Sequence, residues 1–517
     1  MIKAGVAALP RTDAKRNLAA VAGLPAALAA IGVAIVWLFD WGAYLHRFTQ
    51  GISAYIFLFG VQFALYLLAC YAVLRRRDPL PRAASLATIA IVIVFAGVFR
   101  GQVAGKPPYL STDVYRYVWD GRVQANGVNP FRYIPTAPEL ARLRDDKIFP
   151  KINGADYAPT PYPPVAQAIY LAVYLIRPLS VTAFKVAMSL FDLLTVVATM
   201  LVLVRLRMDP ARAIIFAWHP LEIWEGIHSG HVDQVFIAFL ALAVLAWAYK
   251  KNTLTGVAVG LATLVKLYPV MLLPVFLVNR REGDGEHESL GSTQTNSLRY
   301  PAAGVQDAPG IGFEAGSLPL RRLRSVMLSR SALHMILGFV ATIVICYLPY
   351  LTAGSAVYRN LSDYFKEEGF VEQGGRYFVL TLVRGIVPMP TTLYSALAAL
   401  ALGGLAVWWL LRQKRDAMDI AKGALALIGL YLLLTSPRYP WYFCWIVPWL
   451  CFLPRAGWLY LTGATILLYT LWFIPNEFPN LPLWLGAALY IPAILLLAAQ
   501  RFHARSKPDY AGSMPNH

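Results

Sequence analysis

A polar, aromatic stretch between residues 100 and 164 holds the side chains best suited to chemistry. Its centre reads Ser111-Thr112-Asp113-Val114-Tyr115-Arg116-Tyr117-Val118-Trp119-Asp120-Gly121-Arg122, and Asn129-Pro130-Phe131 and Tyr162-Pro163-Pro164 follow. A carboxylate such as Asp113 can take the proton of a hydroxyl group, and aromatic rings can hold a sugar. The alternative is that Asp113 caps a helix beginning at Val114, because Asp is a favoured N-cap residue. The spacing alone leaves both interpretations open.

A second polar cluster comprises Glu222, Glu225, His228, His231 and Asp233. Residues three apart fall on one helical face, so the first four predict a polar stripe. His-x-x-His-x-Asp is able to bind a divalent metal, but the spacing is loose and no cysteine supports it. A metal is therefore possible and not favoured. The other interpretations are a helix end that is hydrogen-bonded to water and lipid head groups, and a rim that faces a substrate.

Two cations lie in apolar surroundings. Lys266 precedes Tyr268-Pro269, which breaks the helix, and Arg438 belongs to Ser436-Pro437-Arg438-Tyr439-Pro440-Trp441. Charges at membrane depth are costly and usually face a cavity or a partner, although a lysine can also extend to the interface. The planar fork of arginine suits phosphate oxygens. We favour phosphate contacts for both cations, whereas Arg376 better fits a solvated loop.

Composition identifies a membrane protein. The chain has 517 residues, of which 58% are hydrophobic and 14% charged, against about 45–50% and 25% in soluble domains. Many apolar runs approach the roughly 20 residues that cross a bilayer. The net charge of +18 comes from Lys/Arg clusters at the ends of these runs, which is typical of the positive-inside rule and of contact with membrane lipids. This pattern argues against nucleic-acid binding.

The four cysteines lie in apolar segments without CxxC spacing, which argues against a disulfide framework or a zinc site. The first apolar run has full spanning length and no small-residue cleavage site after it, so we expect a retained helix. Gly256 and Gly260, four residues apart, predict close helix packing.

The basic clusters predict the organisation of the chain. We expect a membrane module at 1–280 with an outer loop at 100–164, a flexible cytoplasmic linker at 281–330 and a second membrane module at 331–517. About 12–14 helices should span the membrane fully or partly, and 165–176 should be interfacial or re-entrant. The expected helices are 19–39, 54–74, 84–99, 181–204, 213–226, 232–249, two halves within 253–277, 332–352, 390–411, 419–435, 441–454, 457–474 and 481–500.

Four segments carry a family resemblance. They are DVYRYVWDGRVQANGVNPF, HPLEIWEGIHSGHVDQ, GVAVGLATLVKLYPVMLLP and TSPRYPWYFCWIVP. In this order they resemble the motifs of bacterial GT-C superfamily glycosyltransferases, most of all the polyprenol-phosphate-mannose-dependent mannosyltransferases. The resemblance covers most of the chain apart from the linker and both tails.

The resemblance implies an all-α bundle, an extracytoplasmic first loop that bears the catalytic acid, and inversion at the anomeric carbon. Asp113 best matches the acid, and Asp120 is the second candidate. The chain lacks the two adjacent acids of some members, so their metal-dependent chemistry is not carried over. The residues expected to bind substrate are Tyr115, Arg116, Tyr162, His228, His231, Asp233, Lys266, Tyr268, Arg376, Arg438 and Tyr439.

The expected activity is transfer of a hexose, with mannose implied by the resemblance, from a polyprenyl-phosphate carrier to a glycan or glycolipid acceptor. The expected location is the bacterial inner membrane, with the active site on the extracytoplasmic side. No nucleotide site is required, because no Walker-type glycine-rich loop is present. The rival interpretations are a secondary transporter or lipid-linked sugar flippase, which internal symmetry would favour, and an assembly role without catalysis.

Overall fold

The structure is a computed structural model in which regular secondary structure is helical throughout the described residues. The described residues are 23–40, 51–76, 80–157, 159–277, 327, 329–357, 377–412, 416–473 and 481–505. Within them, eight helices are long and apolar enough to cross a membrane, or nine if the bent pair Glu222–His228 and Asp233–Ala248 forms one span. The predicted polytopic all-α membrane protein is confirmed.

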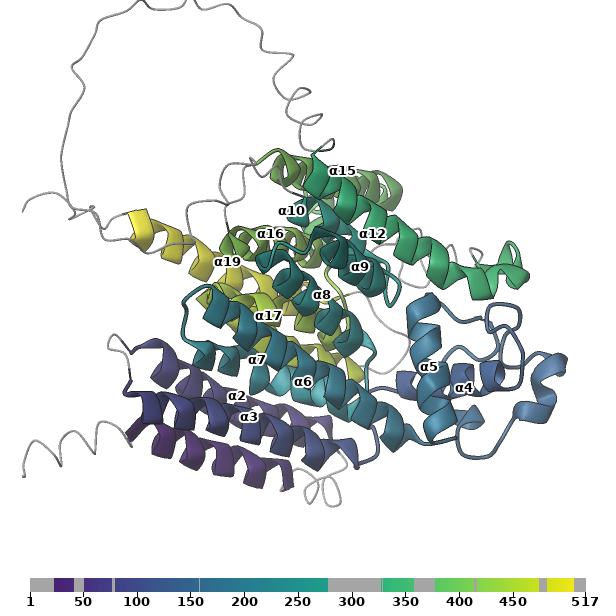
Figure 1. The fold of residues 1–517 in the computed structure, drawn as a ribbon, viewed down its shortest axis with the longest axis horizontal. Helices are drawn as coiled ribbons and strands as arrows, with labels where there is room; N and C mark the ends of the chain where they lie inside the picture. Colours follow the sequence, from purple (N-terminus) through teal and green to yellow (C-terminus); the bar gives the residue numbers. More distant parts are fainter. Residues whose placement is uncertain are drawn as a thin grey trace, which may run out of the picture.

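The long helices form most of the bundle (Figure 1). They are Gly23–Asp40, α2 (Ile52–Leu74), α3 (Arg82–Ala104), α6 (Val181–Arg205), α8 (Asp233–Ala248), α12 (Arg330–Tyr347), α15 (Thr391–Leu411), α16 (Ala417–Thr435) and α19 (Leu483–Arg505). Most begin and end within a few residues of the predicted ranges, because long apolar runs bounded by charge or proline determine them.

The other elements are shorter or broken, and the expected 12–14 spans included such partial crossings. They are α4 (Asp113–Ala125), η1 (Pro138–Leu143), η2 (Phe149–Lys151), α5 (Pro164–Ile176), η3 (Pro210–Ala213), α7 (Ile214–Ala217), η4 (Glu222–His228), α9 (Asn252–Thr263), η5 (Tyr268–Leu272), α10 (Leu273–Phe276), η6 (Leu348–Ala353), α14 (Phe378–Arg384), η7 (Pro440–Ile446), α17 (Val447–Leu450), α18 (Ala456–Ala464) and η8 (Thr465–Phe473). Prolines stand at the start of several of these elements, since proline lacks the N–H that continues a helix.

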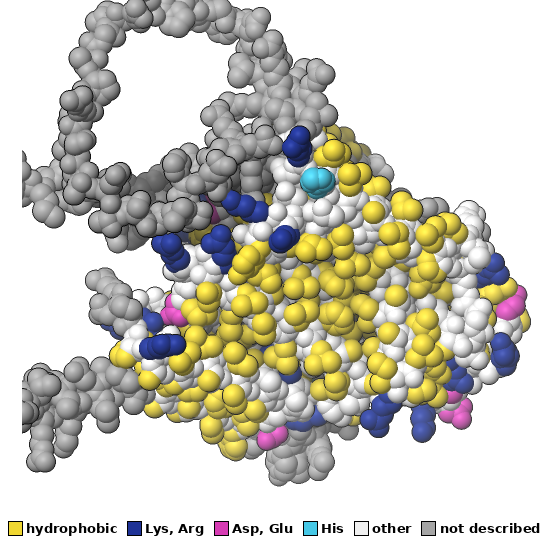
Figure 2. Space-filling view, in the orientation of Figure 1, with side chains coloured by type: hydrophobic (Ala, Val, Ile, Leu, Met, Phe, Trp, Pro, Cys, Tyr) yellow, Lys and Arg dark blue, Asp and Glu magenta, His cyan; other side chains and the backbone are white. Residues whose placement is uncertain are grey.

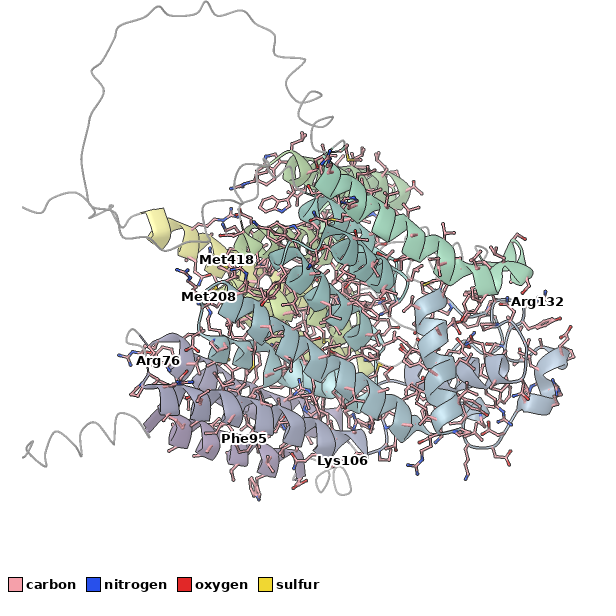
Figure 3. The ribbon with its side chains drawn as sticks, viewed as in Figure 1. Arg76, Phe95, Lys106, Arg132, Met208 and Met418 are labelled. Carbon is pink, nitrogen blue, oxygen red and sulfur yellow. The ribbon has the colours of Figure 1, made fainter. Side chains whose placement is uncertain are left out.

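The two ends of the bundle differ in character. Arg76, Met208 and Met418 mark one end, while Arg132 lies beyond the other, in the module formed by α4, α5 and their connection (Figures 1 and 3). Hydrophobic side chains cover the middle of the visible face, and Lys and Arg lie mainly to either side of it (Figure 2). Such an apolar band flanked by charge is what a bilayer requires.

The α4–α5 module is fixed internally and to η6, the element that follows α12. A Cβ on Gly121 would lie 2.5 Å from the carbonyl oxygen of Tyr170, so only glycine permits this close approach of α4 to α5. Asn129 donates to the carbonyl of Tyr350 at 3.1 Å, and the Tyr350 hydroxyl donates to Gln124 at 3.0 Å. Helix α5 has 13 residues, fewer than the roughly 20 of a full span, and runs crosswise to α6 at this end of the bundle (Figure 1).

Close packing between α9 and α12 confirms the prediction for Gly256 and Gly260. A Cβ on Gly256 would lie 1.9 Å from the carbonyl oxygen of Met335, and one on Gly260 would lie 3.0 Å from Thr342. These helices flank the predicted linker 281–330, which lies outside the described residues except for Met327, Ser329 and Arg330.

Candidate functional site

Four irregular points of the helical bundle meet at one place. They are the start of α4, the bend between η4 and α8, the break between α9 and η5, and the 3-10 helix η7. The axes of η4 and α8 differ by 116°. At this bend Gly230 has φ +79°. A Cβ on this residue would lie 3.1 Å from the Lys185 side chain and 3.2 Å from that of Val114. This glycine therefore lets the bend before His231 pack against Val114, the residue that follows Asp113.

Asp113 is the first residue of α4, and its side chain is 20% exposed. The N-cap of α4 is Thr112, not Asp113, and the Asp113 amide donates to the hydroxyl oxygen of Ser111 at 3.2 Å. Its Oδ2 lies 3.9 Å from Nε2 of His231. The helix-cap alternative thus misplaces this residue by one position, and the carboxylate faces an imidazole.

The orientation of the His231 ring follows from one hydrogen bond. Its Nδ1 lies 2.7 Å from the main-chain carbonyl oxygen of Glu225, and the ring is 1% exposed. Since a carbonyl only accepts, Nδ1 carries the proton and Nε2 of the neutral ring presents its lone pair toward Asp113. Two proton acceptors therefore face each other across 3.9 Å.

Beside this pair, Asp233 holds Lys266. The Lys266 ammonium donates to the two carboxylate oxygens at 3.0 and 2.9 Å, and the Trp445 indole donates to Oδ1 at 2.7 Å. The same ammonium lies 5.1 Å from the ring centre of Tyr442 and 5.8 Å from that of Trp445. The Lys266 side chain remains 16% exposed, so this cation is oriented by protein and still accessible.

Stacked aromatic rings form the opposite side of the site. Trp441 stacks on His231 with ring centres 4.1 Å apart, and Tyr439 stacks on Trp441 at 4.4 Å. Tyr268 stacks on Trp445 at 3.5 Å. Arg438, partly buried, immediately precedes Tyr439. The segment 438–445 thus reaches both His231 and Asp233.

Asp120 and Arg116 form an internal pair. Arg116 Nε donates to Asp120 at 2.9 Å, and Gln167 donates to the other Asp120 oxygen at 3.0 Å. Asp120 lies two helical turns beyond Asp113, about 10.5 Å along α4. The structure therefore assigns its carboxylate contacts within the module and not with His231.

The loop tyrosines also make protein contacts. Lys151 lies 5.0 Å above the ring of Tyr115. The Tyr162 hydroxyl donates to that of Tyr117 at 3.4 Å. Burial raises the pKa of Tyr117 well above its ordinary value, and the negative charge of Asp113 raises it further. The Tyr117 hydroxyl thus stays protonated close to Asp113.

The predicted polar stripe is wrong. Residues 222–228 form a π-helix, whose wider turn separates side chains that an α-helix would align. Glu222 accepts from Gln234 at 2.9 Å, Glu225 accepts from Tyr469 at 2.7 Å, and the His228 ring packs on Trp224 at 4.9 Å. In the described part of the chain, no three His, Cys, Asp or Glu side chains are arranged to hold a metal ion.

Three residues of the site were not predicted from the sequence, and one predicted residue has no described position. Trp441, Trp445 and Tyr469 were not predicted individually, although the first two lie in the quoted segment TSPRYPWYFCWIVP and its aromatic density was the available signal. Tyr469 lies in an apolar run that offers no such signal. Arg376 lies outside the described residues, which resume at Tyr377.

Comparison with known families addresses the same region. Residues 161–283 match the model of glycosyltransferase family 87. The matched range contains η4, the bend at His231, α8 and the break at Lys266, whereas α4 and η7 lie outside it. Together with the membrane-length helices, the match supports a membrane glycosyltransferase. No curated protein matches the chain.

Proposed function

We propose that this protein transfers a hexose from a polyprenyl-phosphate carrier to a glycan or glycolipid hydroxyl at the extracytoplasmic face, with inversion. The observation that carries this proposal is the facing pair of Asp113 and His231 beside the oriented cation Lys266. A base and a phosphate-binding cation within one site are the two requirements of such a transfer. The sugar is mannose by resemblance.

The base would act on the acceptor. Asp113 takes the proton of the acceptor hydroxyl, and its oxygen attacks the anomeric carbon on the face opposite the phosphate. The separation of 3.9 Å between Asp113 Oδ2 and His231 Nε2 exceeds a direct hydrogen bond of about 2.7–3.2 Å. A hydroxyl beside the two groups would donate its single proton to Asp113, and the proton can pass from Asp113 to Nε2 once the oxygen has attacked.

The cations would act on the leaving group. The bond between the anomeric carbon and the phosphate oxygen breaks, and its electron pair remains on the polyprenyl phosphate. Lys266 offers one N–H direction beyond its two contacts with Asp233, and Arg438 supplies a planar fork. Asp233 and Trp445 would thus position Lys266 for charge that develops in the transition state.

The sidedness of this proposal rests on the basic clusters. The site lies at the start of α4, in the module at the end of the bundle opposite Arg76 (Figure 3). The positive-inside rule assigns the Arg76 end to the cytoplasm.

The test is direct. Purified protein is incubated with defined polyprenyl-phosphate hexoses and a membrane glycolipid extract, and the products are identified by mass. The expected result is a hexosylated product together with free polyprenyl phosphate, for one donor above the others. Donors that remain intact in every combination, with a folded protein, would contradict the proposal, and movement of the intact donor across vesicles would instead support a flippase.

A further inference from the structure

Glu225 is a buried carboxylate that the reaction above does not use. Its side chain is 0% exposed, and Oε2 lies 3.8 Å from Nδ1 of His231. The other oxygen, Oε1, accepts from the Tyr469 hydroxyl at 2.7 Å. Within the part of the chain that the structure describes, no Lys or Arg forms an ion pair with Glu225. An acid buried in this way calls for an explanation.

The main-chain carbonyl oxygen of Glu225 contacts His231 at two atoms. The π-helix η4 places the Glu225 carbonyl 2.7 Å from His231 Nδ1, and the His231 amide lies 3.4 Å from the same oxygen. Tyr469, from the distant element η8, fixes Oε1 and leaves Oε2 beside the ring. Irregular helical turns of this kind are frequent at functional sites.

A second carboxylate beside the ring adds to the stabilisation of a protonated His231, for which Asp113 supplies the first opposite charge after it passes the proton to Nε2. When the proton reaches Nε2, His231 becomes a cation inside the protein, which is costly without an opposite charge nearby. Lys266 and Asp233 already neutralise each other at 2.9 Å. The two carboxylates that flank the ring are Asp113 at 3.9 Å and Glu225 at 3.8 Å.

We propose that Glu225 is a positioning residue: its main-chain carbonyl keeps the proton of His231 on Nδ1, and its side chain, anchored by Tyr469, stabilises the ring when Nε2 accepts the acceptor's proton. The role rests on the proposed transfer reaction. In that reaction the proton moves from the hydroxyl to Asp113, then to Nε2, and leaves through Asp113. Glu225 touches no substrate.

Other ionisable groups surround this pair and must be considered in any pH experiment. Asp113 from α4, Asp233 from α8 and Lys266 act on His231. Tyr55 from α2, Tyr469 from η8 and Cys444 from η7 face Glu225. All remain in place when Glu225 alone is changed.

The experiment compares Glu225→Gln with the wild type in transfer from the polyprenyl-phosphate hexose that the mass assay selects. Glutamine keeps the acceptor for Tyr469 but removes the charge. We expect turnover to fall by about 10–100-fold with an unchanged KM for the donor. The acidic limb of the rate profile should move to lower pH, because the protonated ring is less stabilised.

Glu222→Gln is the matched control, since Glu222 lies in the same element, is equally buried and accepts from Gln234. The acidic limb of the pH–rate profile of Glu222→Gln should stay at the wild-type pH. In a His231→Gln background, Glu225→Gln should cost little more, because it acts through the ring. A folded Glu225→Gln protein with the wild-type limb would overturn the role of Glu225 while the transfer proposal stands.

If Glu225→Gln does not fold, Tyr469→Phe decides the question. Loss of the Tyr469 donor destabilises the ionised carboxylate, so the limb should move in the same direction by a smaller amount, and an unmoved limb overturns the role. Normal transfer by both His231→Gln and Asp113→Asn would refute the proposed base itself.

Discussion

Asp113 lies in a setting that suits the proposed base. The first turn of a helix favours a negative charge, and the lone pair on Nε2 of His231 lies 3.9 Å from Oδ2 of Asp113. A proton that Asp113 took from a hydroxyl would therefore have a second acceptor beside it.

We predict that Asp113→Asn retains its fold and donor binding but loses turnover by about 10²–10⁴-fold, the usual contribution of a general base. Asparagine has the same size but does not take up a proton. The measurement is single-turnover transfer with the selected donor. A folded variant that transfers at a near-normal rate would return Asp113 to a structural role and leave Asp120 or Asp233 as the base.

Asp120→Asn is the comparison in the same helix, and we expect it to lose less turnover. It removes the charge that accepts from Arg116 at 2.9 Å, and breaking a buried ion pair costs about 3–5 kcal/mol. Its melting temperature should therefore fall while that of Asp113→Asn does not.

We predict that removal of either cation weakens donor binding. Arg438→Lys should also bind less tightly, since a point charge does not reproduce a bidentate contact. Lys266→Ala leaves Asp233 buried without its cation, so the charge-balanced Lys266→Ala/Asp233→Asn variant is measured beside it. Donor Kd at neutral pH is the readout. Wild-type affinity in Arg438→Ala and in the balanced double variant would locate the phosphate elsewhere.

At the scale of elements, the breaks in the helices matter more than the helices. The sequence predicted the break at Lys266–Pro269, because a charge and a proline interrupt an apolar run. It also predicted a short apolar segment at 165–176, where α5 has 13 residues. It did not predict the π-helix at 222–228, since residues three apart suggested an ordinary helical face, and this error misplaced Glu222 and Glu225.

The same limit applies to the site. Apolar periodicity and charge determined the long helices, so their positions could be predicted from local sequence. Asp113 and His231 are 118 positions apart in the sequence. Their approach depends on how α4 packs against the bend at Gly230. Such a contact leaves no local signal, and the family resemblance supplied the association.

We predict that Gly256→Ala destabilises the protein, whereas Gly97→Ala does not. A Cβ at Gly256 would lie 1.9 Å from the carbonyl oxygen of Met335, while one at Gly97 meets nothing within 4 Å. An exposed helical Gly→Ala change is otherwise favourable by about 1 kcal/mol, so opposite signs are expected. Thermal stability in detergent is the measurement, and equal effects would contradict the packing argument.

At the scale of the whole molecule, the bundle has a direction. The α4–α5 module and the candidate site lie at one end, and the Arg76–Asp209 ion pair at 2.9 Å lies at the other (Figure 3). The sugar donor and the acceptor would then both reach the site at the same side of the bilayer.

We predict that Ala125→Cys is labelled from outside the cell and Ser292→Cys from inside. Ala125 is exposed at the end of α4, and it avoids Gly127, whose φ of +77° disfavours a side chain. The measurement uses a membrane-impermeant maleimide on intact and inverted vesicles, with the unmodified chain as background for its four cysteines. Labelling of both positions from the same side would refute the topology.

The contact between α9 and α12 has a consequence for how the polypeptide can be divided. The two helices approach so closely that neither Gly256 nor Gly338 has room for a Cβ. At Gly338 a Cβ would lie 2.4 Å from the carbonyl oxygen of Thr253. This seam joins the portion before residue 278 to the portion after 329 without depending on the peptide that connects them. Two fragments, 1–290 and 291–517, expressed from separate genes should therefore assemble in the membrane and restore one another's transfer activity.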